Sequence, residues 1–199
     1  MNGPQHALIA LGSNLPSEQA GHPDVTLRVA LRMLHAEDHL SIHAVSSFWT
    51  TPAHPAGSGP DYCNAAALVG TSLPPEALLD CLHRIEAALG RLRPKDAARW
   101  QSRPLDLDLI AIGDAVLPDE ATHDHWRALP PARQAQAAPQ TLILPHPRLQ
   151  DRGFVLAPLA EIAPDWSHPR TGLTVAQMLT ALPKDALLGM RRVAAVDRP

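Results

Sequence analysis

The order in which short apolar segments follow one another is the feature that most limits how this chain can fold. Apolar residues recur either at every second position, as in a strand, or with the roughly 3.6-residue period of a helix. The segments come in the order strand, helix, strand, strand, helix, strand. This order is typical of an α+β fold with a ferredoxin-like βαββαβ core, in which an antiparallel sheet carries its helices on one face.

Local signals give the boundaries of these segments. The first helix is expected to begin after Pro23-Asp24, because proline is tolerated in the first turn of a helix. Pro74-Pro75 opens the second helix, and Gly90 closes it. The expected strands span residues 7–11, 40–50, 62–69 and 105–112.

Beyond this core the chain is expected to add a loop and further helices to a single domain of residues 1–199. One connection is polar, rich in proline and alanine, and longer than most loops in compact domains. These parts are a core at about 5–165, a loop insertion at 118–141, helices at 152–162 and 174–182, and a C-terminal extension at 166–199 with a frayed tail after Arg191.

Composition argues against several classes of protein. A chain of 199 residues can bury a core without disulfides, so Cys63 and Cys81 are expected as buried thiols in a reducing compartment. The formal net charge of −3 argues against a nucleic-acid partner. Both lysines, Lys95 and Lys184, precede aspartate, so the chain has no Gly-Lys-Ser/Thr phosphate loop. We find no signal peptide and no membrane-spanning apolar run, and therefore expect a cytoplasmic protein with no membrane partner.

The segment Arg103-Pro-Leu-Asp-Leu-Asp108 is the strongest chemical signal in the chain. Residues two positions apart on a strand point to the same face, so Asp106 and Asp108 are expected to lie side by side. Two such carboxylates can hold a pair of divalent ions about 3.5–4 Å apart, and hard oxygen ligands suit magnesium. The alternative interpretation is an amphipathic strand with two solvated acids, although aspartate is uncommon in strands.

Four arginines follow the second helix, with a tryptophan among them. Arginine binds phosphate oxygens through two parallel hydrogen bonds, so a cluster of this kind favours a polyphosphate ligand. The alternative is a basic loop that is simply solvated. The residues are Arg91, Arg93, Arg99, Arg103 and Trp100.

Three further signals are ambiguous when each is taken alone. Glu86 lies at the edge of the apolar stripe of its helix, where a carboxylate either reaches solvent or points into a cleft. His146 lies between two prolines and could donate to a phosphate or stack in a loop. Tyr62 and Asn64 share one strand face, which suits a flat heterocycle with a hydrogen-bonding edge but also an ordinary core.

Taken together, these segments resemble 6-hydroxymethyl-7,8-dihydropterin pyrophosphokinase of folate biosynthesis. The resemblance runs from about Ala7 to Ile162, and its nine motifs occur in the expected order. The motifs are Leu11-Gly-Ser-Asn14, Val45-Ser-Ser-Phe-Trp-Thr-Thr-Pro52, Asp61-Tyr-Cys-Asn64, Arg84-Ile-Glu86, Gly90-Arg-Leu-Arg93, Arg99-Trp100, Arg103-Pro-Leu-Asp-Leu-Asp108, Leu144-Pro-His-Pro147 and Asp151-Arg-Gly-Phe154.

The resemblance implies a magnesium-dependent enzyme that transfers pyrophosphate from ATP, the co-substrate, to the hydroxymethyl group of the dihydropterin and releases AMP. Two magnesium ions would be held by Asp106 and Asp108, and a monomer is expected. Arg91 and Arg103 would act with these acids on the migrating phosphates. The implied pterin-binding residues are Thr51, Pro52, Ala53, Tyr62, Asn64, Trp100 and Phe154. The implied ATP-binding residues are His83, Glu86, Arg93, Ile110, His146 and Arg152.

The sequence departs from the family pattern in ways that concern the nucleotide side. Pro147 follows the histidine where some members carry tyrosine, and the loop at 93–103 is longer than in compact members. The insertion at 118–141 leads directly into His146, so we expect it to cover the nucleotide side.

Three other functions compete with this interpretation. Another magnesium- and ATP-dependent phosphoryl or nucleotidyl transferase would share the same metal and nucleotide residues. A non-catalytic ferredoxin-like binding domain would scatter the acids and arginines instead of gathering them. An RNA-binding domain would need a basic face and stacking aromatics on its central strands, which the net charge disfavours.

Overall fold

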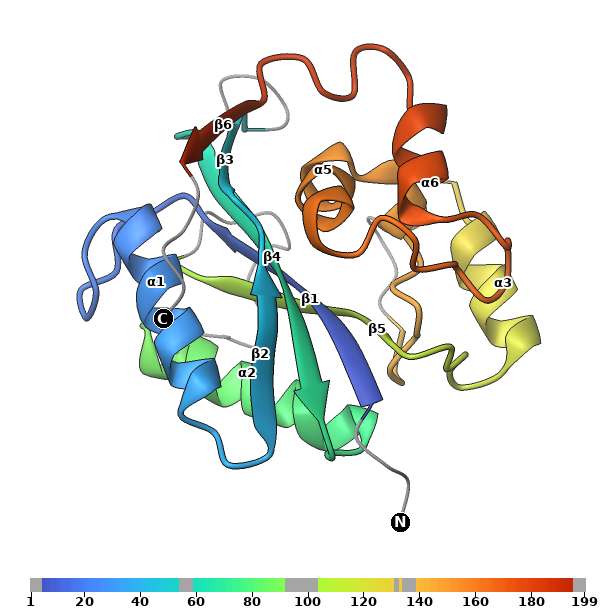
Figure 1. Ribbon diagram of the computed structural model, residues 1–199, viewed down its shortest axis with the longest axis horizontal. Coiled ribbons are helices and arrows are strands. Elements are labelled where there is room, and N and C mark those ends of the chain that lie inside the picture. Colours follow the sequence, from blue (N-terminus) through green and yellow to red (C-terminus); the bar gives the residue numbers. More distant parts are fainter. Residues whose placement is uncertain (1–4, 54–58, 92–103, 131–132, 134–138, 195–199) are drawn as a thin grey trace.

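The computed structural model describes residues 5–53, 59–91, 104–130, 133 and 139–194. Its sheet is antiparallel, with the strand order β5-β1-β4-β3-β6, and β2 also pairs with β4 (Figure 1). The mixed α+β class with an antiparallel sheet is thus confirmed. The strands are β1 (Gln5–Ser13), β2 (Leu40–Val45), β3 (Phe48–Thr51), β4 (Tyr62–Thr71), β5 (Asp106–Ile112) and β6 (Arg191–Ala194). The helices are α1 (Pro23–His35), α2 (Pro75–Ala88), α3 (Glu120–Ala128), η1 (Leu149–Asp151), α5 (Gly153–Ile162) and α6 (Val175–Ala181).

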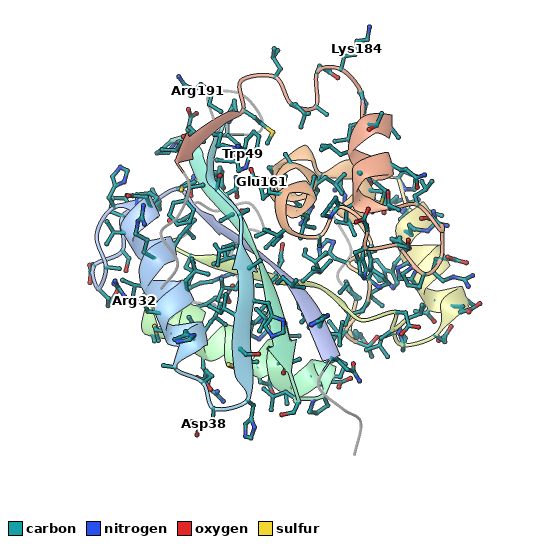
Figure 2. All side chains as sticks on the ribbon, in the orientation of Figure 1. Arg32, Asp38, Trp49, Glu161, Lys184 and Arg191 are labelled. Atoms are coloured by element: carbon teal, nitrogen blue, oxygen red, sulfur yellow. The ribbon has the colours of Figure 1, made fainter. Side chains whose placement is uncertain are left out.

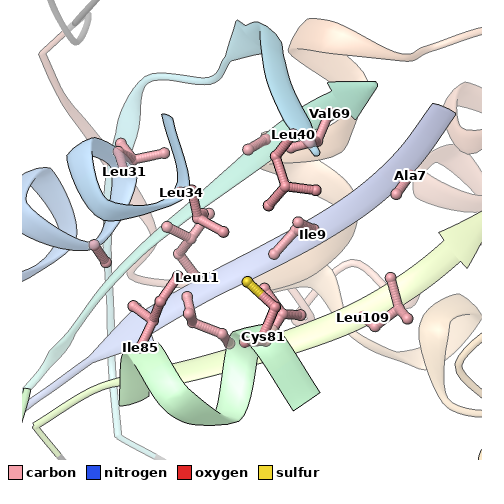
Figure 3. Close-up of a cluster of buried hydrophobic side chains, with 14 of the residues drawn as sticks. Ala7, Ile9, Leu11, Leu31, Leu34, Leu40, Val69, Cys81, Ile85 and Leu109 are labelled. Carbon is pink, nitrogen blue, oxygen red and sulfur yellow. The ribbon is translucent and has the colours of Figure 1, made fainter. Parts of the chain in front are cut away.

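Strand β1 lies between β4 and β5 and divides its side chains between two hydrophobic clusters. Ile9 and Leu11 point into the larger cluster, which α1 and α2 cover (Figure 3). Leu8 and Ala10 point to the opposite face, into a second cluster formed with α5 and α6. Successive side chains of a strand alternate between faces, so a strand that is apolar throughout must be covered on both sides.

Helices therefore cover both faces of the sheet: the two core helices share one face, as expected, and the further helices cover the other, a placement that the sequence did not predict. In Figure 1, α1 and α2 lie on one side of the strands and α5 and α6 on the other. The second layer forms because α5 is apolar along most of its length. Its buried residues Val155, Leu156 and Leu159 pack on the face of the sheet that the first two helices leave open.

The first two helices form much as the sequence predicts. Each begins at a proline, Pro23 or Pro75, with an acidic residue in its first turn. The apolar stripe of α2 includes Leu78, Leu82 and Ile85, all at most 2% exposed. Each such side chain contributes roughly 1.5–3 kcal/mol to folding by leaving water.

Ser46 and Ser47 interrupt the strand that we expected at 40–50. The hydroxyl of Ser46 accepts the N–H of Ala66 at 2.9 Å, and its own N–H donates to the Ala66 carbonyl at 2.9 Å. The N–H of Ser47 instead donates to the carboxylate of Glu161 at 2.8 Å. Because these groups leave the regular ladder, the segment forms two strands, β2 and β3.

Two segments expected to be irregular are ordered. Helix α3 lies within the supposed loop insertion, and the side chain of Asp119 caps it by accepting the N–H of Thr122 at 2.8 Å. Strand β6 occupies the supposed frayed tail, where it pairs with β3. Each expectation is wrong for the described part of its segment, because tertiary contacts order sequences whose own pattern is weak.

Both cysteines are free; Cys81 is buried and Cys63 is half-buried. Among the helices of the described ranges, none combines the length and the apolar character that crossing a bilayer would require.

Candidate active site

Asp106 and Asp108 open the strand β5 and point to the face that α5 covers. Their neighbours Leu107 and Leu109 are buried in the cluster under α1 and α2, so alternation along the strand sends the two carboxylates the other way. In the sheet they lie opposite Gly12 and Ala10 of β1. Their side chains are 31% and 35% exposed, which leaves both carboxylates within reach of a ligand.

A partly open pocket joins these acids to residues from three other elements. The acids come from β5, an amide from β4 and an aromatic ring from the start of α5, while β1 forms its floor. The two acids therefore lie side by side, as expected, and share this pocket with Asn64 and Phe154, two of the residues predicted to bind the pterin. The lining residues are Ala10, Leu11, Gly12, Asn64, Asp106, Asp108, Phe154 and Val155.

Arg91 connects α2 to the first of these acids. Its Nη1 atom donates to Oε1 of Glu86 and to Oδ1 of Asp106. Glu86 is 1% exposed, and its Oε1 also accepts the backbone N–H of Leu107 at 2.7 Å. Glu86 is therefore not a surface acid: it holds both Arg91 and the backbone of β5 in place.

Arg152 has the equivalent position on the other side of the pair. Its Nη1 atom donates to Oδ2 of Asp108 at 3.2 Å, and its guanidinium carbon lies 5.7 Å from the centre of the Phe154 ring. Each acid of the pair thus has its own arginine. Phe154 is 41% exposed, so a ligand can reach it.

His146 lies on the turn that precedes α5. Its backbone N–H donates to the carbonyl of Ile110 at 2.7 Å, which ties the turn to β5. Its Nδ1 accepts the N–H of Arg148 at 3.1 Å, so in the neutral ring the proton is on Nε2. Burial lowers the pKa of His146 well below its usual value, and the charge of Arg152 lowers it further. The ring is therefore a neutral donor at pH 7.

The residues expected to read the pterin edge meet where β3 ends. Asn64 Nδ2 donates to Thr51 Oγ1 at 2.6 Å, and Tyr62 lies opposite Thr51 in the β3–β4 register. Thr51 and Ala53 are buried, whereas Pro52 is exposed.

Gly12 is a part of this site that the sequence-based list of residues missed. A methyl group added to Gly12 would lie 2.9 Å from Oδ1 of Asn64, so only glycine lets that amide reach the floor of the cavity. The signal was present in the motif Leu11-Gly-Ser-Asn14, but the glycine received no role there. Asn14 of the same motif donates to the carbonyl of Pro60 at 3.4 Å, ahead of β4.

Not every expected residue comes to the cavity. His83 lies on α2 and is not among the residues that line it. Arg93, Arg99, Trp100 and Arg103 lie outside the described residues. In the described part of the insertion, Nε2 of His123 on α3 donates to the carbonyl of Pro145 at 3.0 Å, next to His146.

The donor set at the acid pair consists of carboxylate oxygens alone. Within the described ranges, no group of three or more His, Cys, Asp or Glu side chains is placed to hold a metal ion. Asp106 and Asp108 could thus supply only part of a coordination shell. This suits magnesium, which commonly binds one or two carboxylates and completes its shell with water and substrate phosphates.

A model of the family 7,8-dihydro-6-hydroxymethylpterin-pyrophosphokinase (HPPK) matches residues 8–164 of the chain. The chain belongs to the HPPK family. The family resemblance and the enzyme class expected from the sequence are therefore confirmed, and the chain is a pyrophosphokinase of this family.

Two relatives within the HPPK family match over most of their own length. The chain is 36% identical over 173 residues to 2-amino-4-hydroxy-6-hydroxymethyldihydropteridine pyrophosphokinase of Synechocystis sp., covering 87% of this chain and 74% of the relative. It is 34% identical over 180 residues to the protein of the same name from Haemophilus influenzae, covering 89% and 91%.

A solved structure shows that the fold is shared at much lower identity. The HPPK-DHPS protein of Plasmodium falciparum, a triple mutant, superposes with a TM-score of 0.60 at 14% identity. The match covers 90% of this chain but 44% of the Plasmodium chain, so this chain spans less than half of that protein.

Proposed function

We propose that this HPPK-family chain transfers the β,γ-pyrophosphoryl group of ATP to the hydroxyl of 6-hydroxymethyl-7,8-dihydropterin, yielding the pterin diphosphate and AMP in folate biosynthesis. The observation that carries the proposal is that Asp106 and Asp108 share a cavity with Asn64 and Phe154. The two acids suit the cations that accompany a nucleotide, and the amide and the exposed aromatic ring beside them suit a flat heterocycle.

Magnesium fits the acid pair on the chemistry of its donors. Two ions held by Asp106 and Asp108 would neutralise charge on the ATP phosphates and keep the reacting groups in line. The protein groups around them would do the positioning. Glu86 fixes the backbone of β5 at Leu107, and thereby the direction in which both aspartates point.

The arginines are proposed to bind the phosphates. In this structure, Arg91 pairs with Asp106 and Arg152 pairs with Asp108. Both guanidinium groups can instead bind the oxygens of a phosphate that enters the site. Arg103 and Arg93 are proposed to act on the same phosphates. Neutral His146 would donate from Nε2 to a phosphate oxygen, since its lowered pKa removes any charge of its own.

The pterin is proposed to lie at the Asn64 end of the cavity. Tyr62 and Phe154 would stack on its two faces, with Trp100 closing over the site. Asn64 and the backbone at 51–53 would bind its donor and acceptor edge, which an amide can match with both of its groups. Ile110 and His83 are proposed to lie on the adenosine side. A monomeric state and a cytoplasmic location stay predictions.

The test is a single incubation of the full chain with ATP, MgCl₂ and the dihydropterin alcohol, with products separated by chromatography. We expect equal amounts of AMP and pterin diphosphate, and no product after chelation of the metal. Formation of ADP would make the protein a one-phosphate kinase and overturn the proposal. AMP formed without the pterin would indicate the competing transferase with another acceptor.

A further inference from the structure

The last described part of the chain crosses the molecule beside the proposed pterin site. Residues 183–194, named here the C-terminal strap, leave α6 and end as β6 against β3 (Figure 1). Successive turns shape its first half, in which the N–H groups of Ala186, Leu188 and Met190 each donate to a carbonyl three residues earlier, at 3.0–3.1 Å. The strap therefore has a defined course, although many of its side chains are exposed.

The strap touches both walls of the proposed pterin site. A methyl group on Gly153, the residue before Phe154, would lie 2.7 Å from the carbonyl oxygen of Ala186. A methyl group on Gly189 would lie 2.7 Å from Cγ of Pro52. Packed heavy atoms do not approach one another within about 3 Å, so neither glycine leaves room for a methyl group. The strap therefore lies directly against the start of α5 and the end of β3.

Polar contacts anchor the far end of the strap. Arg192 of β6 pairs with Oε1 of Glu161 at 2.9 Å, and its guanidinium lies 5.7 Å from the ring centre of Trp49. The same carboxylate accepts the indole N–H of Trp49 at 2.9 Å and the N–H of Ser47 at 2.8 Å. Figure 2 shows Trp49 and Glu161 close together near the start of β6 at Arg191. Strands β3 and β6 and helix α5 are thus joined at one point.

We infer that the C-terminal strap is a positioning element for the pterin substrate, which sets the separation between Pro52 and Phe154. This rests on the proposed function, because it assigns those two residues to the pterin. The sheet alone does not fix this separation, since Pro52 follows the last residue of β3 while Phe154 belongs to the helix layer above. Among the described residues, the strap forms no such contact with the proposed nucleotide residues on β5 and α2, so we expect it to affect the pterin more than ATP.

Two glycines make a matched test. Gly189 and Gly172 have φ angles of 78° and 69°, so alanine costs a similar backbone strain at both. Nothing lies within 4 Å of a methyl group at Gly172, whereas at Gly189 it would press on Pro52. We expect Gly189→Ala to raise the KM for the dihydropterin alcohol about fivefold over Gly172→Ala, with a similar KM for ATP in the two variants.

Equal pterin KM in the two variants, or an equal rise for both substrates, would overturn the inference while leaving the proposed function intact. A wild-type protein that neither binds nor converts the pterin would refute the proposed function, and the inference with it.

A second pair of variants tests the anchor without touching a glycine. Arg192→Met removes the charge that reaches Glu161, while Arg191→Met removes a neighbouring charge that forms no ion pair within the described structure. We expect the first to raise the pterin KM by about two- to threefold and the second to leave it unchanged. The same KM in both variants would contradict the role of the anchor.

Discussion

Arg152, at the start of α5, donates from Nη1 to Oδ2 of Asp108 across 3.2 Å and so joins α5 to β5. The two residues are separated by 44 positions in the chain. Because the ring of Phe154 lies under the same guanidinium, this one contact brings together a proposed metal ligand, a proposed phosphate ligand and a proposed pterin-stacking residue.

Replacement of Asp108 by alanine should nearly abolish turnover. We expect kcat to fall at least about 10³-fold, because a preorganised charged group at the reacting centre can contribute that much. Asp114→Ala, at an exposed aspartate just beyond the other end of β5, is the control and should retain wild-type kcat. Initial rates of AMP formation give the comparison. Activity of Asp108→Ala close to that of the control would refute the metal assignment.

Glu86→Gln should lower stability more than its exposed counterpart on the same helix. Glutamine can still accept the N–H of Leu107 but no longer offers Arg91 a charge, although Asp106 still does. We expect the free energy of unfolding to fall by about 2 kcal/mol, less than the roughly 3–5 kcal/mol for a buried charge left with no partner. Urea denaturation of this variant and of Glu76→Gln supplies the measurement; a loss under about 1 kcal/mol in both would contradict it.

Tyr62→Ala should separate the two substrates. The variant loses a proposed stacking face, so we expect the KM for the pterin to rise about tenfold while the KM for ATP changes less than about twofold. Titration of ATP binding in the absence of pterin provides the internal control. A parallel loss of both affinities would mean that Tyr62 supports the whole site and not the ring alone.

A buried histidine predicts a specific loss of stability in mild acid. His168 is 0% exposed, its Nδ1 accepts the N–H of Arg170 at 3.1 Å, and its ring centre lies 5.5 Å from that of His123. Burial, together with the charges of His123 and Arg127, lowers the pKa of His168 to about 4.

The direction of this change in the free energy of unfolding depends on which state binds a proton at His168. Above pH 7 neither state binds a proton at this ring, so protonation of His168 does not change the free energy of unfolding there. Between about pH 6.5 and 4 only the unfolded chain binds one, so the free energy of unfolding falls by up to roughly 3 kcal/mol. His168→Asn, which keeps an acceptor for Arg170, should flatten this slope in urea titrations across that range. His125→Asn, at an exposed ring on α3, should keep it. An unchanged slope in His168→Asn would show that other groups cause the acid loss.

The strands and the acid pair could be predicted because they depend on local periodicity. Buried leucines at every second position of β5 force Asp106 and Asp108 to the other face, and the sequence alone carries that information. The helix in the insertion could not be predicted in the same way. Its single buried residue, His123, gives no apolar stripe, and the capping residue Asp119 was the one available signal.

Contacts between residues far apart in the sequence account for the features that could not be predicted. The break between β2 and β3 depends on Glu161, 114 positions after Ser47, which no local pattern reveals. The order in β6 depends on the same carboxylate through Arg192. The sequence did not determine whether Glu86 is buried or exposed, because it lies at the edge of the apolar stripe of its helix. Its burial depends on what packs beside the helix, here the backbone of β5.

The pairing of each aspartate with an arginine has a thermodynamic consequence for how the site fills. If the proposed function holds, a lone divalent cation would compete with guanidinium groups that already neutralise both carboxylates. A polyphosphate that arrives with the cation would give those groups new anions and so reduce the competition. Cation and nucleotide would then be heterotropic ligands, each of which tightens the binding of the other by the same factor.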